Sequence, residues 1–163
     1  MEMIFNVREV FEIAEEIERS GVAFYEKAAK IAKEPEGKKF LLELAVMEEG
    51  HEKRFHSLKE EFTAKEGDEF YDIDNKALTY LKTIGSGAIF DITNDTSEQF
   101  TGEETLEEIY NLAIKFEKET VVYFTTIKNI VPESLGKDKI DLLIAEEIGH
   151  IMSISKQLHT IKK

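Results

Sequence analysis

Residues 41–58 read LLELAVMEEGHEKRFHSL, and their apolar positions recur at steps of three and four. This period is typical of an amphipathic helix with one buried face. The residues that share this face are Leu41, Leu44, Glu48, His51, Phe55 and Leu58. A glutamate and a histidine one turn apart thus interrupt an apolar stripe, because residues three apart on a helix are neighbours.

The same pattern occurs a second time near the end of the chain. Residues 140–157 read IDLLIAEEIGHIMSISKQ, and a shift of 99 residues carries Glu48 to Glu147 and His51 to His150. Both copies have the form Glu-x-Gly-His inside an apolar stripe. An internal repeat of this kind predicts two structurally similar halves.

Each half also contains a single glutamate in the preceding apolar stripe. These residues are Glu18 and Glu117, which the same 99-residue shift relates, and each precedes its Glu-x-x-His pair by 30 residues. Helical periodicity alone does not require this polar duplication. The matched spacing therefore marks four glutamates and two histidines as candidate functional residues.

Four long helices account for most of the apolar periodicity. Short loops place the first helix antiparallel to the second, and the third antiparallel to the fourth. Thr101, with Glu104 in capping-box position, is predicted to open the third helix. The predicted helices cover approximately 6–32, 36–65, 101–131 and 138–158. With the long connection 67–101, this predicts an all-α, ferritin-like antiparallel four-helix bundle with one long crossover between helices two and three, as a single domain over residues 1–163.

Four carboxylates that point into one core need compensating charge. Burying a lone carboxylate is costly, and several facing one another repel. The arginines, Arg8, Arg19 and Arg54, lie off the apolar stripes. One Glu from each of two helices and a Glu-x-x-His pair from each of the other two is the ligand pattern of di-iron and di-manganese bundles. The predicted metal ligands are Glu18, Glu48, His51, Glu117, Glu147 and His150.

The same residues also have interpretations that involve no metal. Taken singly, a Glu-x-x-His pair is more often a solvated helix face, and a metal-free bundle used for protein contacts would leave the four glutamates uncompensated. Four further glutamates are either solvated or accept a hydrogen bond from a ligand histidine, namely Glu49, Glu52, Glu119 and Glu146. Tyr25 is a core aromatic that could hydrogen-bond the site. Gly50 and Gly149 are expected to allow close helix approach, and His56 and His159 are expected at the surface.

Composition narrows the function classes. The chain has no cysteine, which excludes disulfides, thiolate zinc sites and iron–sulfur clusters. Its net charge of -13 argues against a nucleic-acid partner, since such a partner requires a basic surface. No apolar stretch is long enough to span a membrane, and the N-terminus does not read as a secretory signal. A cytoplasmic location is therefore expected.

The chain resembles the ferritin-like domain of rubrerythrins over its whole length. The matching motifs are Glu18 with Tyr25, Glu48-Glu49-Gly50-His51, Glu117 with Tyr123-Phe124, and Glu147-Ile148-Gly149-His150. Rubrerythrins are di-iron proteins that reduce hydrogen peroxide. The resemblance implies two iron ions, a homodimer, and Glu48 and Glu147 as bridging or chelating ligands. It further implies that Glu18 and His51 complete one iron shell, that Glu117 and His150 complete the other, and that the four glutamates act in catalysis.

Two departures from the rubrerythrin pattern stand out. Rubrerythrins usually carry a cysteine-bound iron module that supplies electrons, so this cysteine-free chain is expected to use a separate electron-donor protein. Rubrerythrins also carry an additional glutamate where this chain has Thr120. The leading hypothesis is a di-iron protein that reduces peroxide or dioxygen. The alternatives are ferritin-like iron binding or oxidation without a dedicated substrate, and a di-manganese site with catalase-like activity, since carboxylates and imidazoles accept both metals.

Overall fold

The computed structural model describes residues 4–66, 69–71, 99–130 and 136–162. Four long helices make up most of this part of the chain. In chain order the elements are β1 (Ile4–Asn6), α1 (Val7–Ile31), α2 (Pro35–Glu66), β2 (Glu69–Tyr71), α4 (Leu106–Ile130) and α5 (Lys137–Ile161). Within these ranges, no helix combines the length and the apolar composition needed to cross a membrane.

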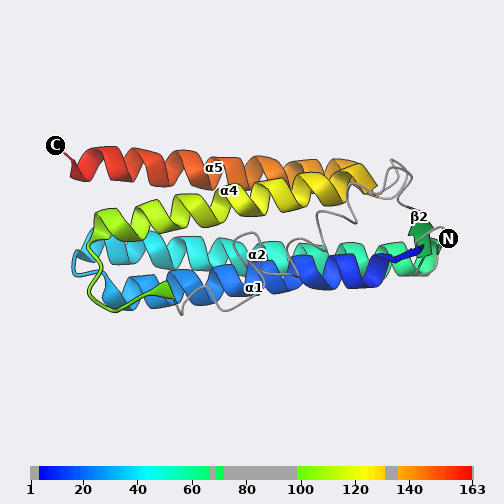
Figure 1. Cartoon of the computed structure of the whole chain (residues 1–163), viewed down its shortest axis with the longest axis horizontal. Helices are drawn as coiled ribbons and strands as arrows, with labels where there is room; N and C mark the ends of the chain where they lie inside the picture. Colours follow the sequence, from blue (N-terminus) through cyan, green and yellow to red (C-terminus); the bar gives the residue numbers. More distant parts are fainter. Residues whose placement is uncertain (1–3, 67–68, 72–98, 131–135, 163) are drawn as a thin grey trace.

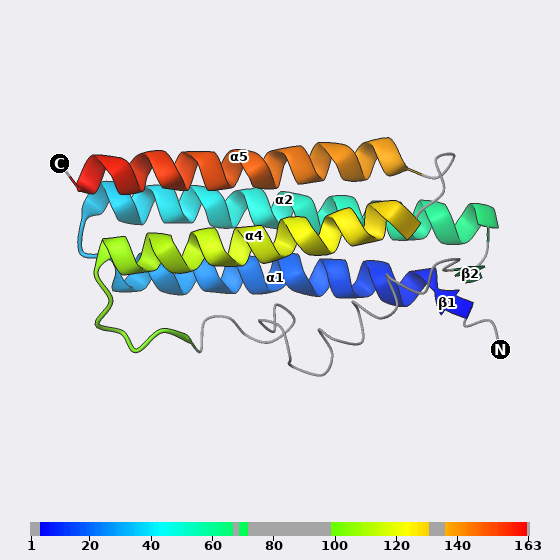
Figure 2. The same cartoon turned by 45° about the horizontal axis from the view of Figure 1, so that its top comes forward.

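The four helices lie side by side along one axis (Figures 1 and 2). Helix α1 is antiparallel to α2, and α4 is antiparallel to α5, whereas α2 and α4 run in the same direction. Helix α2 ends and α4 begins at opposite ends of the bundle. The predicted ferritin-like bundle with one long crossover is confirmed.

Two short strands, which the sequence did not indicate, pair at one end of the bundle. β1 and β2 are antiparallel, with Ile4 opposite Tyr71 and Asn6 opposite Glu69. Each has three residues, too few for the alternating apolar pattern that identifies a strand. They join the start of α1 to the chain that leaves α2, and they do not change the all-α architecture.

The apolar core consists of two clusters, one on each side of a buried polar layer. Each of the four helices contributes residues to both clusters and crosses the polar layer near its middle. The first cluster includes Phe11, Ile17, Phe55, Leu58, Phe124 and Ile140. The second includes Phe24, Tyr25, Leu41, Leu44, Tyr110 and Ile154. The polar layer is therefore enclosed by apolar side chains along the bundle axis.

Helix α4 begins later than the sequence predicted. Thr101 does donate hydrogen bonds to Glu104, with 2.6 Å from the Thr101 amide to the Glu104 carboxylate, but both residues precede the helix. The pair that opens α4 is Thr105 and Glu108: the Thr105 amide donates to Glu108 at 2.8 Å, and the Glu108 amide donates to the Thr105 hydroxyl at 3.3 Å. The prediction of Thr101 as the cap was wrong, because the same four-residue pattern occurs twice and only the second copy precedes the helix.

Candidate metal centre

All six candidate ligands lie in the polar layer that divides the core. Their exposed fractions do not exceed 5% in any case. Helix α1 contributes Glu18, α2 contributes Glu48 and His51, α4 contributes Glu117, and α5 contributes Glu147 and His150. The spacing along each helix places these side chains on its apolar face, so packing that face buries them together.

The six side chains form two overlapping groups of potential metal donors. One group is Glu18, Glu48, His51 and Glu147, and the other is Glu48, Glu117, Glu147 and His150. Within each group, one donor atom per residue lies within 4.8 Å of every other donor atom. Glu48 and Glu147 belong to both groups, so the arrangement provides two adjacent positions that share two carboxylates.

Both histidines direct Nδ1 into the cluster. His51 Nδ1 lies 2.5 Å from a Glu147 oxygen and 3.5 Å from Glu48. His150 Nδ1 lies 3.0 Å from the other Glu147 oxygen and 3.1 Å from Glu48. The two rings are nearly parallel, with centroids 5.3 Å apart. The histidines thus occupy equivalent places around the two shared carboxylates.

The cluster contains buried polar atoms that the protein alone does not satisfy. Among the described residues, these atoms include both oxygens of Glu18, both oxygens of Glu147, and Nδ1 of each histidine. Native structures rarely leave such groups without a partner, and a bound ion would supply one. The donors are carboxylate oxygens and imidazole nitrogens, which suit iron or manganese. The residues present therefore fit a two-metal centre.

The electrostatics of the cluster also favour cations. Burial, together with repulsion from Glu147 and Glu48, raises the pKa of Glu18 well above its ordinary value. Burial likewise raises the pKa of Glu117, with repulsion from Glu48 and Glu147 as the next causes. Burial lowers the pKa of His150, but the carboxylates of Glu117, Glu147 and Glu48 outweigh it and raise that pKa to about 12. Without a metal, protons thus take the place of cations in this layer.

Glu146 contacts the outer nitrogen of a cluster histidine. His51 Nε2 lies 2.8 Å from a Glu146 oxygen, and Arg54 donates to the other Glu146 oxygen at 2.6 Å. Of the two interpretations the sequence left open for Glu146, the structure selects contact with a histidine. Glu52 instead accepts a hydrogen bond from Arg19 at 2.8 Å. The sequence could not identify Arg54, because its partner lies on a different helix.

Tyr25 and Thr120 flank the cluster with different effects. The Tyr25 hydroxyl donates a hydrogen bond to Glu117, as the sequence allowed. Thr120 is buried at 1% exposure, and its hydroxyl donates to the Phe116 carbonyl at 3.1 Å. Its side chain is therefore engaged with its own helix, and the cluster has no fifth carboxylate at this position.

Close helix approach occurs at Gly21, and the prediction for Gly50 and Gly149 was wrong. A Cβ at either Gly50 or Gly149 would meet nothing within 4 Å. A Cβ at Gly21 would lie 3.2 Å from the Glu48 side chain and 3.2 Å from Phe116. The sequence favoured the glycines that precede the histidines, but Gly50 and Gly149 lie on helix faces that, within the described ranges, make no contact with another helix. His56 and His159 are exposed, as expected.

Four antiparallel helices with a long crossover, enclosing a buried carboxylate–histidine cluster, define a ferritin-like bundle with a candidate two-metal centre. Comparisons agree with this class. Residues 1–59 match the rubrerythrin family model. The whole fold is similar to a crystal structure of a candidate ferritin-like diiron-carboxylate protein from Thermotoga maritima, with a TM-score of 0.73 and 22% sequence identity over 98% of this chain and 97% of that chain. Among curated proteins, none matches this chain. Residues 1–59 thus resemble rubrerythrins, and the fold of the chain is ferritin-like.

Proposed function

We propose that this protein binds two iron ions and uses them to reduce hydrogen peroxide or dioxygen, with electrons from a separate donor protein. One observation carries the proposal: two buried donor groups share Glu48 and Glu147, and several of their carboxylate oxygens have no hydrogen-bond partner. In the proposed centre, Glu18 and His51 hold one metal, Glu117 and His150 hold the other, and the two shared glutamates bind both.

The protein's own residues prepare this centre. When bound, iron would supply electrons and Lewis acidity for cleaving an O–O bond. The carboxylates provide hard oxygen ligands, which favour the oxidised metal. The two apolar clusters exclude bulk water along the bundle axis. Glu146 holds the ring of His51 through its outer nitrogen. The Tyr25 hydroxyl donates a hydrogen bond to Glu117, which lowers the charge that this carboxylate offers a metal.

The choice of iron rests on likeness rather than on the donor set. Carboxylate and imidazole ligands accept manganese as well. The rubrerythrin match over residues 1–59, and a similar fold described as a diiron-carboxylate protein, both favour iron. A catalase-like di-manganese centre is the corresponding alternative outcome of metal analysis.

A second candidate function is iron binding and oxidation without a dedicated substrate. Thr120 favours it, because its hydroxyl bonds to the Phe116 carbonyl and offers the metals no additional carboxylate. Rubrerythrins have a glutamate at this position. A centre that lacks this ligand would be less adapted to repeated peroxide turnover.

Metal analysis and a peroxide assay test the proposal together. We expect two irons per chain after anaerobic loading with ferrous iron, and peroxide consumption over many turnovers when a chemical or protein reductant is supplied. Glu48→Ala should lose both metals, because Glu48 belongs to both donor groups. Glu49→Gln is the matched control, since Glu49 is the exposed neighbour of Glu48 on the same helix.

Three outcomes separate the candidates. If the bound ferrous iron is oxidised once and no further peroxide is consumed, the result favours iron binding and oxidation without a dedicated substrate. Two manganese ions in the isolated protein, with peroxide dismutation, favour the catalase-like centre. No bound metal under any loading condition overturns the two-metal proposal itself.

A further inference from the structure

The two halves of the candidate centre are related by the 99-residue repeat, but their surroundings differ at two places. The repeat pairs His51 with His150 and Glu18 with Glu117. It pairs Glu146 with Met47, and Tyr25 with Phe124. Each mismatch replaces a hydrogen-bonding side chain by one that cannot take its place, so the two metal positions have different support.

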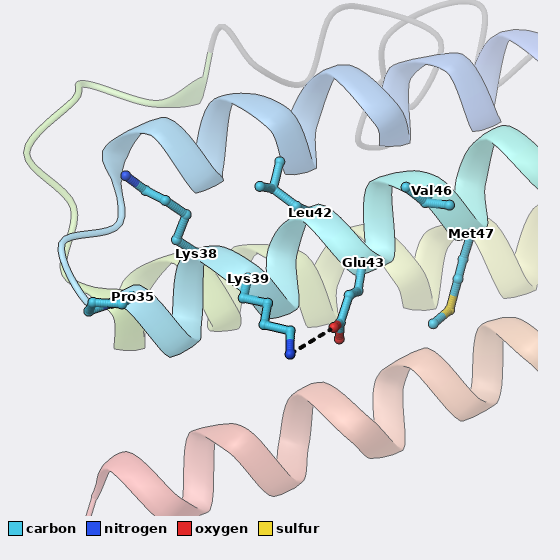
Figure 3. Close-up of a pocket in the computed structure, with 7 residues that line it drawn as sticks. All are labelled: Pro35, Lys38, Lys39, Leu42, Glu43, Val46 and Met47. Atoms are coloured by element: carbon cyan, nitrogen blue, oxygen red, sulfur yellow. Dashed lines mark ion pairs between the residues drawn. The ribbon is translucent and has the colours of Figure 1, made fainter.

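The first difference concerns the outer nitrogens of the histidines. His51 Nε2 contacts Glu146 at 2.8 Å, and Arg54 fixes Glu146 at 2.6 Å. A carboxylate that accepts the outer N–H of a ligand histidine fixes its tautomer and ring orientation and makes the inner nitrogen a stronger ligand. For His150, the repeat places Met47 where Glu146 would be. Met47 extends from α2 toward α5 in Figure 3, and its thioether is only a weak acceptor.

The second difference concerns the terminal glutamates. Tyr25 donates a hydrogen bond to Glu117, whereas its repeat counterpart Phe124 has no hydroxyl to offer Glu18. Both oxygens of Glu18 are buried without a hydrogen-bond partner. A carboxylate that already accepts a phenolic hydrogen bond has less charge to give a metal, so Glu117 is the weaker ligand of the two. Both differences act in the same direction.

From these two differences, we infer that the two metal positions are not equivalent: the position of Glu18 and His51 binds metal more tightly and fills first. Glu146 is its positioning residue, acting through His51. The inference rests on the proposed function, since it requires that the cluster binds two metals. At limiting metal, the protein would therefore hold one ion, on the His51 side.

Single-position variants separate the two affinities. Glu117→Ala leaves the donor group Glu18, Glu48, His51 and Glu147 intact, and Glu18→Ala leaves the group Glu48, Glu117, Glu147 and His150 intact. The probe is ferrous iron without oxygen, titrated by calorimetry. We expect one ion per chain in each variant, bound at least about tenfold more tightly in Glu117→Ala, the scale typical of such outer contacts.

The role of Glu146 is tested within these two backgrounds. Glu146→Gln should weaken iron binding about 10- to 100-fold in the Glu117→Ala protein. In the Glu18→Ala protein it should change binding by less than about twofold, because His150 does not contact Glu146. Met47→Glu, which supplies the missing counterpart, should strengthen binding in the Glu18→Ala protein. The His51 Nε2–H proton resonance should move upfield with Glu146→Gln, which a general loss of stability would not produce.

The outcomes distinguish this inference from the proposed function. Equal affinities in the two single-position variants, or equal weakening of both by Glu146→Gln, would overturn the inference while leaving a two-metal centre. Tighter iron binding in Glu18→Ala than in Glu117→Ala would also overturn the inference, because the position of Glu117 and His150 would then be the stronger one. A protein that binds no iron in the wild-type form would overturn the proposed function instead.

Discussion

His150 shows, at the scale of one residue, how the cluster stores protons when no metal is bound. Burial works against its charged form, yet Glu117, Glu147 and Glu48 raise its pKa to about 12. Burial also raises the pKa of Glu18 and of Glu117, so these carboxyls hold protons more strongly than exposed ones. A metal must displace such protons, because histidine and carboxylate ligands bind metal in their deprotonated forms.

Metal loading is therefore expected to release protons, and the affinity for ferrous iron to rise with pH between about 6 and 8. The sign follows from proton counts: the metal-free protein binds more protons, so higher pH favours the loaded form. Each proton released adds about tenfold in affinity per pH unit. Calorimetry in buffers of different ionisation enthalpy measures the number released. His56→Ala, outside the cluster, should leave that number unchanged, and affinity independent of pH would contradict the prediction.

The candidate ligands could be predicted from the sequence because helical period and repeat spacing both fix which face a residue occupies. Glu48 and Glu147 follow from their apolar stripes and the 99-residue shift. The outer contact of Glu146 could not be selected, since it joins α5 to His51 on α2, and its formation depends on the rotation of both helices. The same limit explains why Gly50 was chosen over Gly21 for close helix approach.

At the scale of the elements, the start of α4 shows where local patterns become ambiguous. Thr101 with Glu104 and Thr105 with Glu108 have the same spacing and make similar hydrogen bonds. Phe100 is buried and its ring packs 4.8 Å from that of Phe24, so the segment after it connects this anchor to the helix. The second pair is the one in which the glutamate amide donates back to the threonine hydroxyl, and the burial of Phe100 is a tertiary contact that the local pattern does not contain.

Thr105→Ala is expected to lower the free energy of unfolding by about 1 kcal/mol, because the Thr105 hydroxyl accepts from the Glu108 amide at the helix start. Thr101→Ala is the matched control. It should lower the free energy of unfolding by less, since the Thr101 hydroxyl accepts no hydrogen bond from an amide of α4. Urea denaturation measures both changes in the free energy of unfolding, provided that the variants and the wild type have equal m-values. A larger loss for Thr101→Ala would show that the helix begins at the first pair after all.

At the scale of the whole molecule, the candidate centre joins two helical hairpins. Helices α1 and α2 provide Glu18, Glu48 and His51, and α4 and α5 provide the other three ligands. Each donor group takes three residues from one hairpin and one, Glu48 or Glu147, from the other. A bound metal would thus hold the hairpins together where the apolar core is interrupted.

Metal should consequently stabilise the fold. The effect of Glu18→Gln on the stability of the protein should change sign when metal is loaded. Loaded wild-type protein gains about 2.7 kcal/mol when free metal is 100 times its Kd, and chelation should remove this gain. Without metal, Glu18→Gln should be at least as stable as the wild type, because it removes a buried carboxylate whose oxygens have no hydrogen-bond partner. With metal it should be less stable, since one position loses a charged ligand. Melting temperatures with and without chelator test both signs, and a Glu18→Gln protein destabilised equally in both states would indicate a purely structural role for Glu18.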